Sequence, residues 1–176
     1  EIDYFDKDTT VIRDNNKEMM VINYLKEYNF QTSDNTIYLS DIDLIGTFIE
    51  DDLKEISEKY DVYTSENLKK VKIIKKTNVS STFKIGQDNI LSYSFDLGDI
   101  KENEIVNILE QIKNKKKYYR LKSGDLVDLE DKNLLELESL TNDLNISKTD
   151  LKKGNGVIPK YRAIYLDSLK NDKYPI

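Results

Sequence analysis

Residues 113–129 read Lys-Asn-Lys-Lys-Lys-Tyr-Tyr-Arg-Leu-Lys-Ser-Gly-Asp-Leu-Val-Asp-Leu, and the expected organisation of the whole chain can be built outward from them. Two short apolar runs flank a turn that contains Gly124, and glycine supplies the positive φ angle that tight hairpin turns require. The pattern predicts a β-hairpin with a basic entry and an acidic exit. A helical pattern ends near Ile112 and another starts near Asp131, so the hairpin is expected between two helices. The alternative interpretation is an ordinary surface hairpin.

The first third of the chain predicts short strands and two longer helices. The expected elements are a hairpin at 2–13, a helix at 16–28, a polar loop at 31–35, a strand at 36–39, a helix that Ser40 caps and that runs to about Lys59, and a strand at 61–65. Met19 and Met20 lie on the first helix and are expected to fill the core. Between Asp41 and Asp61 there are eight carboxylates and two lysines, so the outer face of the second helix is expected to be acidic.

The segment from Leu68 to Leu97 has the strongest strand pattern, and it predicts three strands separated by turns. In the last of them, apolar residues alternate with polar ones, which indicates one buried and one solvated face; the apolar set is Tyr93, Phe95 and Leu97. Asp99 and Glu102 are then expected to cap the helix that ends near Ile112.

A leucine-rich helix and a final helix are expected after the hairpin. The leucines recur at helical spacing as Leu134, Leu137, Leu140 and Leu144. Gly154 and Gly156 are expected to break the chain, and Pro159 is expected in the first turn of a last helix, whose apolar residues are Ala163, Ile164, Tyr165, Leu166 and Leu169. This order of elements predicts an α+β fold, mostly of antiparallel strands in a meander and hairpins, with about five helices.

Length and composition limit the possible functions. A chain of 176 residues suits a single domain spanning 1–176, and a division into two lobes, about 1–66 and 67–176, is the alternative. The chain has no Cys and no His, which excludes thiol nucleophiles, imidazole bases and zinc sites built on those residues. No run approaches the ~20 apolar residues of a membrane span. Because the sequence begins with Glu1, we expect a piece of a longer intracellular protein, without a membrane partner.

No motif for catalysis, a metal or a cofactor stands out. Gly154-Asn155-Gly156 lacks the Lys-Ser/Thr pair of a phosphate-binding loop. The acidic run from Asp125 to Asp131 lacks the spacing of a calcium loop, and the other carboxylate pairs are expected on a solvated helix face. We therefore expect no catalytic residues, no metal site and no cofactor in this chain.

Two basic clusters are the remaining candidates for a binding site. The first cluster is Lys69, Lys70, Lys72, Lys75, Lys76 and Lys84, and the second is Lys113, Lys115, Lys116, Lys117, Arg120 and Lys122 together with Tyr118 and Tyr119. Lysine and arginine can neutralise phosphates, and an exposed aromatic ring can stack on a base. The alternative is that the lysines are merely solvated and the tyrosines are buried. The net charge of −6 argues against a dedicated nucleic-acid binder.

Several runs resemble the bacterial Snf-family helicase-associated domain. The strongest are Lys-Tyr-Tyr-Arg-Leu-Lys-Ser-Gly-Asp at 117–125 and Pro-Lys-Tyr-Arg-Ala-Ile-Tyr-Leu-Asp-Ser-Leu at 159–169. Supporting runs lie at 18–30, 62–69 and 91–96, so the resemblance covers almost the whole chain in order. It implies a non-catalytic segment of a larger cytoplasmic protein, preceding the two-lobed Swi/Snf-type ATPase motor that acts on double-stranded DNA. It also implies that the final helix, with Tyr161, Arg162, Tyr165 and Asp167, lies at the junction with the motor.

Two main hypotheses follow, and the family gives no catalytic residues to carry over. In the first, the chain is an interaction or regulatory module that packs on the ATPase lobes of the same polypeptide or holds a protein partner. In the second, it contacts double-stranded DNA through the basic clusters. An independent carboxylate-based hydrolase is a third, remote alternative.

Overall fold

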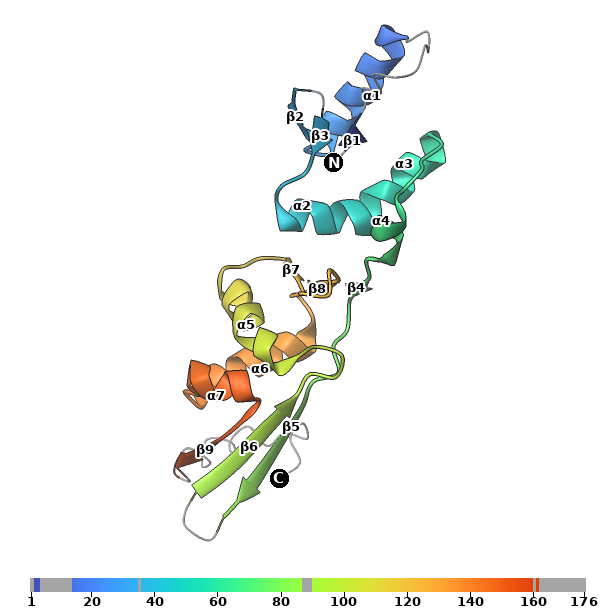
Figure 1. The fold of residues 1–176 in the computed structure, drawn as a ribbon. Helices are drawn as coiled ribbons and strands as arrows, with labels where there is room; N and C mark the ends of the chain where they lie inside the picture. The colour runs from blue at the N-terminus through green and yellow to red at the C-terminus, as the bar shows by residue number, and fades with distance from the viewer. Residues whose placement is uncertain (1, 4–13, 35, 87–89, 160, 162–176) are drawn as a thin grey trace. The chain divides into compact units, whose positions relative to one another are not determined.

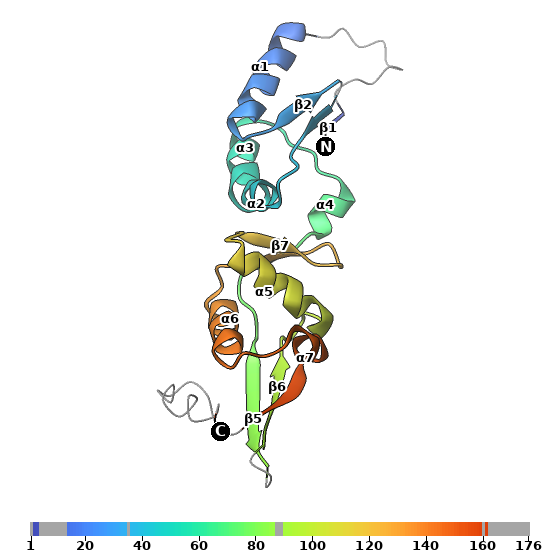
Figure 2. The ribbon, with the colours of Figure 1, turned by 90° about the vertical axis from the view of Figure 1, so that its left-hand side faces the viewer.

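The computed structural model describes residues 2–3, 14–34, 36–86, 90–159 and 161. The chain divides into two compact units, Glu1–Val71 and Lys72–Ile176, which we call unit 1 and unit 2. Both contain helices and small, mainly antiparallel sheets, so the α+β class predicted from the sequence is confirmed (Figures 1 and 2). Most of the expected hairpin at 2–13 and nearly all of the expected last helix lie outside the described residues.

Unit 1 begins with a three-stranded antiparallel sheet in the order β1-β3-β2. Its strands are β1 (Ile2–Asp3), β2 (Gln31–Ser33) and β3 (Thr36–Tyr38), so the segment predicted as a loop at 31–35 supplies a strand instead. The helix α1 (Asn15–Glu27) confirms the predicted one within a residue at each end, and the Asp14 carboxylate accepts a hydrogen bond from the Lys17 N–H at its start. The buried cluster of unit 1 consists of Leu25, Phe30, Ile37 and Ile56.

The prediction that Met19 and Met20 fill the core is wrong. Their exposed fractions are 59% and 69%, and Val21 beside them is 38% exposed. The inward face of α1 instead carries Ile22 and Leu25. Three consecutive apolar residues cannot all lie on one face of a helix. The sequence pattern predicts that α1 has an apolar face, but it did not show which of its apolar residues the rest of unit 1 covers.

One long helical stretch of unit 1 is interrupted by a π-helical turn. Its parts are α2 (Ile42–Thr47), η1 (Phe48–Asp52) and α3 (Leu53–Lys59). The cap is Asp41 rather than the predicted Ser40, because the Asp41 carboxylate accepts from the Asp43 N–H at 2.8 Å. On α3, the Lys59 Nζ donates to both Glu55 and the Tyr24 hydroxyl of α1, at 2.9 Å each, and so joins the two helices.

The strand predicted at 61–65 does not form. Residues 61–65 have no regular structure, and they lead into a short helix, α4 (Glu66–Lys70). The Ser65 hydroxyl accepts from the Leu68 N–H at 3.3 Å and caps this helix. The strand propensity of Val62 and Tyr63 finds no partner strand among the described residues, and the Tyr63 side chain is 94% exposed.

Unit 2 contains two sheets of three strands. The first has the order β5-β6-β9, from β5 (Ser80–Ile85), β6 (Ile90–Asp96) and β9 (Asn155–Pro159), and is antiparallel throughout. The second has the order β4-β8-β7, from β4 (Ile73–Ile74), β7 (Tyr118–Arg120) and β8 (Leu126–Asp128). β4 therefore leaves the predicted three-stranded meander and pairs in parallel with β8. Pro159 ends a strand rather than starting a helix.

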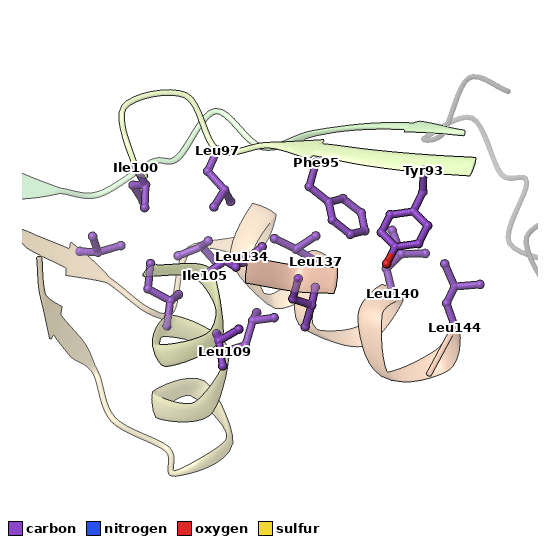
Figure 3. Packing of buried hydrophobic residues seen from close by; sticks show 14 of the residues in the cluster. Tyr93, Phe95, Leu97, Ile100, Ile105, Leu109, Leu134, Leu137, Leu140 and Leu144 are labelled. Carbon is purple, nitrogen blue, oxygen red and sulfur yellow. The ribbon is translucent and has the colours of Figure 1, made fainter. Parts of the chain in front are cut away.

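Three helices of unit 2 cover the inner face of the first sheet. They are α5 (Ile105–Lys113), preceded by the 3-10 turn η2 (Glu102–Glu104), then α6 (Lys132–Asp143) and α7 (Lys148–Lys153). Figure 3 shows Tyr93 and Phe95 of β6, and Leu97 directly after it, pointing toward the leucines of α6, as the alternation and leucine patterns predicted. No side-chain cap is described for η2 or α5, so Asp99 does not have its predicted role.

Candidate functional site

The hairpin predicted at the centre of the sequence is present in unit 2 and positions most of the candidate site residues. β7 and β8 pair antiparallel with Tyr119 opposite Val127. Gly124 has a φ of 98°, and its N–H donates to the Leu121 carbonyl at 2.9 Å, which closes the turn. Because Val127 and Leu129 are buried in the main cluster, this hairpin is part of the core of unit 2 as well as a carrier of exposed charge.

The lysines before the hairpin belong to a tight helix end. Lys113 is the last residue of α5, and Lys115 has a left-handed φ of 57°. The Lys115 and Lys116 N–H groups donate to the carbonyls of Ile112 and Gln111, at 2.9 and 3.1 Å. Positive side chains near a helix C-terminus interact favourably with its unpaired carbonyls, so this placement has a structural benefit besides any binding role.

Tyr118 is not available to stack on a base, and this part of the prediction is wrong. Its side chain is fully buried, at 0% exposure, with the Lys117 Nζ 5.1 Å from the ring centroid. Tyr119 is half-buried, and its hydroxyl lies 3.4 Å from a Glu104 oxygen and 3.3 Å from the Asn107 side-chain amide. Neighbouring residues on a strand face opposite sides, but the sequence did not show which of the two tyrosines faced inward.

A buried carboxylate supports the basic end of the hairpin. Glu104 is 3% exposed, and its Oε2 accepts a hydrogen bond from the Lys122 N–H at 3.1 Å. Lys122 and Arg120 have exposed side chains. Glu104 therefore holds the backbone at Lys122, at the start of the hairpin turn. Glu104 was not singled out from the sequence, where it looked like one more acidic residue at a helix start.

The first basic cluster does not belong to a single unit. Lys69 and Lys70 lie at the end of α4 in unit 1, and Lys69 forms an ion pair with Glu66 at 2.7 Å. Lys72 belongs to unit 2, where its N–H donates to the Asp125 carboxylate and its carbonyl accepts from the Leu126 N–H. These contacts give Lys72 a role in attaching the start of unit 2 to the hairpin.

The structure brings Lys113 together with lysines that the sequence analysis did not select. The Lys148 Nζ of α7 lies 2.5 Å from the Glu110 Oε1 of α5. The hydrogen bond and charge of Lys148, followed by the charges of Lys152 and Lys113, lower the pKa of the Glu110 carboxyl. Ser147 and Asp150 match the capping pattern that marks the start of α7. The Ser147 hydroxyl lies 2.8 Å from the Asp150 carboxylate and accepts a hydrogen bond from the Asp150 N–H at 3.1 Å, but the segment is too short for the sequence alone to predict a helix.

A pocket of about 200 Å³ lies beside this group of lysines. Its lining residues come from α5, from the end of α6 and the following loop, and from α7; they include Val106, Leu109, Glu110, Thr141, Ile146 and Leu151. The Lys113 Nζ donates to the Asn142 side-chain carbonyl at 2.7 Å at its edge. The lining thus combines buried apolar side chains and the buried Thr141 with the solvent-accessible charges of Lys113, Glu110 and Lys148.

The described residues do not offer other recognisable chemistry. Among them, no group of three or more acidic side chains is arranged to hold a metal ion. Within the same residues, no helix has the length and hydrophobicity needed to cross a membrane. Of the residues expected at the motor junction, Tyr161 is 67% exposed, whereas Arg162, Tyr165 and Asp167 lie outside the described residues.

The chain is thus an α+β module that exposes basic side chains on a hairpin and a pocket with a mixed charged and apolar lining. A sequence model of the family described as "Bacterial SNF2 helicase associated" matches residues 1–176, the whole chain, and the protein belongs to this family. This confirms the resemblance noted in the sequence, and it makes the chain an accessory domain of SNF2-type helicases. Neither the curated proteins nor the solved structures contain a match to the chain.

Proposed function

We propose that this chain is a non-catalytic regulatory domain that acts on the ATPase motor of a bacterial Swi/Snf-type translocase through protein contacts. The family match over residues 1–176 carries this proposal. The contacts would be with the ATPase lobes of the same polypeptide, with Tyr161, Arg162, Tyr165 and Asp167 at the junction. Since such a motor works on cellular DNA, the proposal places the domain in the cytoplasm.

The charged surfaces of both units support a role in protein contact. In unit 1, the stretch from Asp41 to Asp61 is rich in carboxylates, and burial, then the charges of Asp51 and Glu55, raise the pKa of Asp52. In unit 2, Lys113, Lys148 and Glu110 line a pocket that also contains buried apolar side chains. A surface that combines charge with a local apolar depression is better suited to binding a specific partner than to keeping the protein in solution.

The test is made in the parent polypeptide. Deleting residues 1–176 should change the rate of DNA-stimulated ATP hydrolysis, because the motor would lose a domain that positions or restrains its lobes. A charge reversal of Lys113 and Lys148 in the intact protein should change that rate in the same direction without unfolding the domain. Unaltered hydrolysis and unaltered DNA affinity in both proteins would refute the proposed function.

Direct contact with double-stranded DNA is the second candidate. Lys115, Arg120 and Lys122 have exposed side chains near one hairpin, which is the observation that favours it. Duplex binding of this kind should weaken with salt, with a slope of about 0.9 per phosphate contact in a log–log plot. The substitutions Lys115→Glu, Lys116→Glu and Lys117→Glu should lower that slope. If the isolated chain does not bind duplex DNA at low salt, this candidate fails and the first is unaffected.

A further inference from the structure

The pocket between α5, α6 and α7 has a base of buried apolar side chains. Val106, Leu109 and Leu151 line it, and each is at most 6% exposed. Ile146, in the loop between α6 and α7, is half-buried beside them. A volume of about 200 Å³ is large enough for one sizeable side chain but small for a typical cofactor or drug-sized ligand.

The rim of this pocket is formed by side chains of opposite charge that hold the three helices together. Lys148 of α7 bonds to Glu110 of α5, and Lys113 of α5 bonds to Asn142 of α6. Lys152 is near enough for its charge to act on the same Glu110 carboxyl. Two lysines therefore line the pocket together with one carboxylate, and the charge of Lys152 adds to theirs, so an incoming carboxylate would be attracted to this rim.

We propose that this pocket receives a single apolar side chain from an acidic segment of a protein partner, with neighbouring carboxylates bound by Lys113 and Lys148. The proposal rests on the proposed function, and it adds the chemistry of the partner and the place where the partner binds. A buried apolar anchor with a polar rim is the arrangement in which a few residues supply most of the binding energy of an interface.

Nucleic acid is a poorer match for the same surface. The lysines would attract phosphates as they would carboxylates, but the buried side chains of Val106, Leu109 and Leu151 would receive no complementary apolar group from a phosphate backbone. An acidic peptide satisfies both features, because its aliphatic side chain can fill the base while its carboxylates replace or share the lysine contacts of Glu110.

Binding of labelled peptides to the whole 176-residue chain tests the proposal. The probe is a fluorescein-labelled hexapeptide, Glu-Asp-Leu-Leu-Asp-Glu, followed by fluorescence anisotropy at low salt. Two matched probes replace the leucines by serines or the acidic residues by lysines. Only the first probe should bind well, and the protein variant with Lys113→Glu and Lys148→Glu should bind it about tenfold more weakly, as expected for reversing two rim charges.

The matched control carries Lys101→Glu and Lys132→Glu, which reverse two exposed lysines outside the pocket and change the net charge equally. It should bind the probe almost as the natural chain does, and circular dichroism checks that both variants are folded. No binding by the natural chain, equal binding of the serine probe, equal losses in the two variants, or stronger binding of a 20-base-pair duplex at the same lysines would each overturn the proposal. None of these results bears on ATP hydrolysis by the domain-deleted parent, so the proposed function is judged separately.

Discussion

Tyr93 packs across Gly156, its direct partner on the neighbouring strand β9. A Cβ atom at position 156 would lie 2.7 Å from the Tyr93 Cζ, closer than real side chains approach. The Tyr93 hydroxyl is buried without a hydrogen-bond partner among the described residues, and this burial, together with the charge of Asp150, raises its pKa to about 12. The absence of a side chain at 156 thus allows a large ring to lie over the sheet.

Gly156→Ala should destabilise unit 2 by about 2 kcal/mol, because either the ring or the β9 backbone must move to accommodate the methyl group. Urea unfolding followed by circular dichroism measures the change. Gly86→Ala is the matched control: its Cβ would be 3.4 Å from the Ile90 carbonyl oxygen, an ordinary contact, and the loss should be much smaller. Equal losses in the two variants would mean that the close approach of Tyr93 has no energetic weight.

At the level of single residues, the sequence predicted burial correctly in β6 and α6 and wrongly at Met19 and Met20. The alternation in β6 and the leucine spacing in α6 were read correctly, because both are local periodicities that a core imposes. The inward facing of Tyr118 was not predicted, and the sequence offered no partner for Lys113, since each depends on segments far away in the chain. Lys113 meets Asn142, and Lys148 meets Glu110, only after the helices have packed.

Among the elements, α6 is fixed at its start by a contact with the chain before β5. The Asp131 carboxylate accepts from the Thr77 N–H and hydroxyl at 2.6 and 2.5 Å, and from the Asn133 N–H at 3.2 Å. The Asn133 amide returns a bond to the Thr77 carbonyl at 2.6 Å. Since Thr77 is only 2% exposed, losing Asp131 would leave buried donors without an acceptor.

Asp131→Ala should therefore cost about 3 kcal/mol, which exceeds the ~1 kcal/mol typical of losing a helix cap alone. The comparison is Ser147→Ala, which removes the cap of α7 in the same unit but no contact to a distant buried residue. Chemical denaturation of both variants provides the measurement. A loss for Asp131→Ala no larger than that for Ser147→Ala would show that the Thr77 contact contributes little.

The ion pair between α5 and α7 predicts a pH dependence. Lys148 lowers the pKa of Glu110 below its usual value of 4.5, so the folded state holds this proton less tightly than the unfolded state. The resulting stabilisation is present above the unfolded pKa and is lost as the pH falls through the folded value. In Lys148→Ala, the Glu110 pKa measured by NMR should rise, and the stability deficit seen at pH 6 should shrink toward pH 3. A deficit that does not change with pH would contradict this account.

The elements also show why local patterns could not give the topology. The hairpin, α1, α6 and the β5–β6 pair all formed where propensity and turn chemistry placed them. β4 was correctly predicted as a strand, but it was placed in the wrong sheet. Its actual partner, β8, is more than fifty residues away in the sequence, so no local pattern indicates the pairing. The strand expected at 61–65 did not form for the opposite reason. Its residues have strand propensity, but among the described residues there is no strand for them to pair with.

At the scale of the whole molecule, the two units have cores of very different size. The described core of unit 1 contains four buried residues, whereas that of unit 2 extends over both of its sheets and α5, α6 and α7. Buried apolar area is the main source of folding free energy, so unit 2 should be the more stable unit.

Thermal or urea unfolding of the chain should accordingly show two transitions, with unit 1 unfolding first. Tryptophan is absent, so residue-resolved NMR or hydrogen exchange is the suitable measurement. Amides of α1 and α3 should exchange at lower denaturant than those of β6 and α6. A single transition with equal protection in both units would show instead that they unfold as one.

The parallel pairing of β4 with β8 has a mechanical consequence. The chain that leaves unit 1 enters unit 2 at Lys72, and its next residues, Ile73 and Ile74, are hydrogen-bonded beside Leu126 and Val127 of the hairpin. A force applied along this connection would act first on the two residue pairs that join β4 to β8. Only after that would the force reach the first sheet or the helices. The basic hairpin is consequently the first part of unit 2 on which a force transmitted from unit 1 would act.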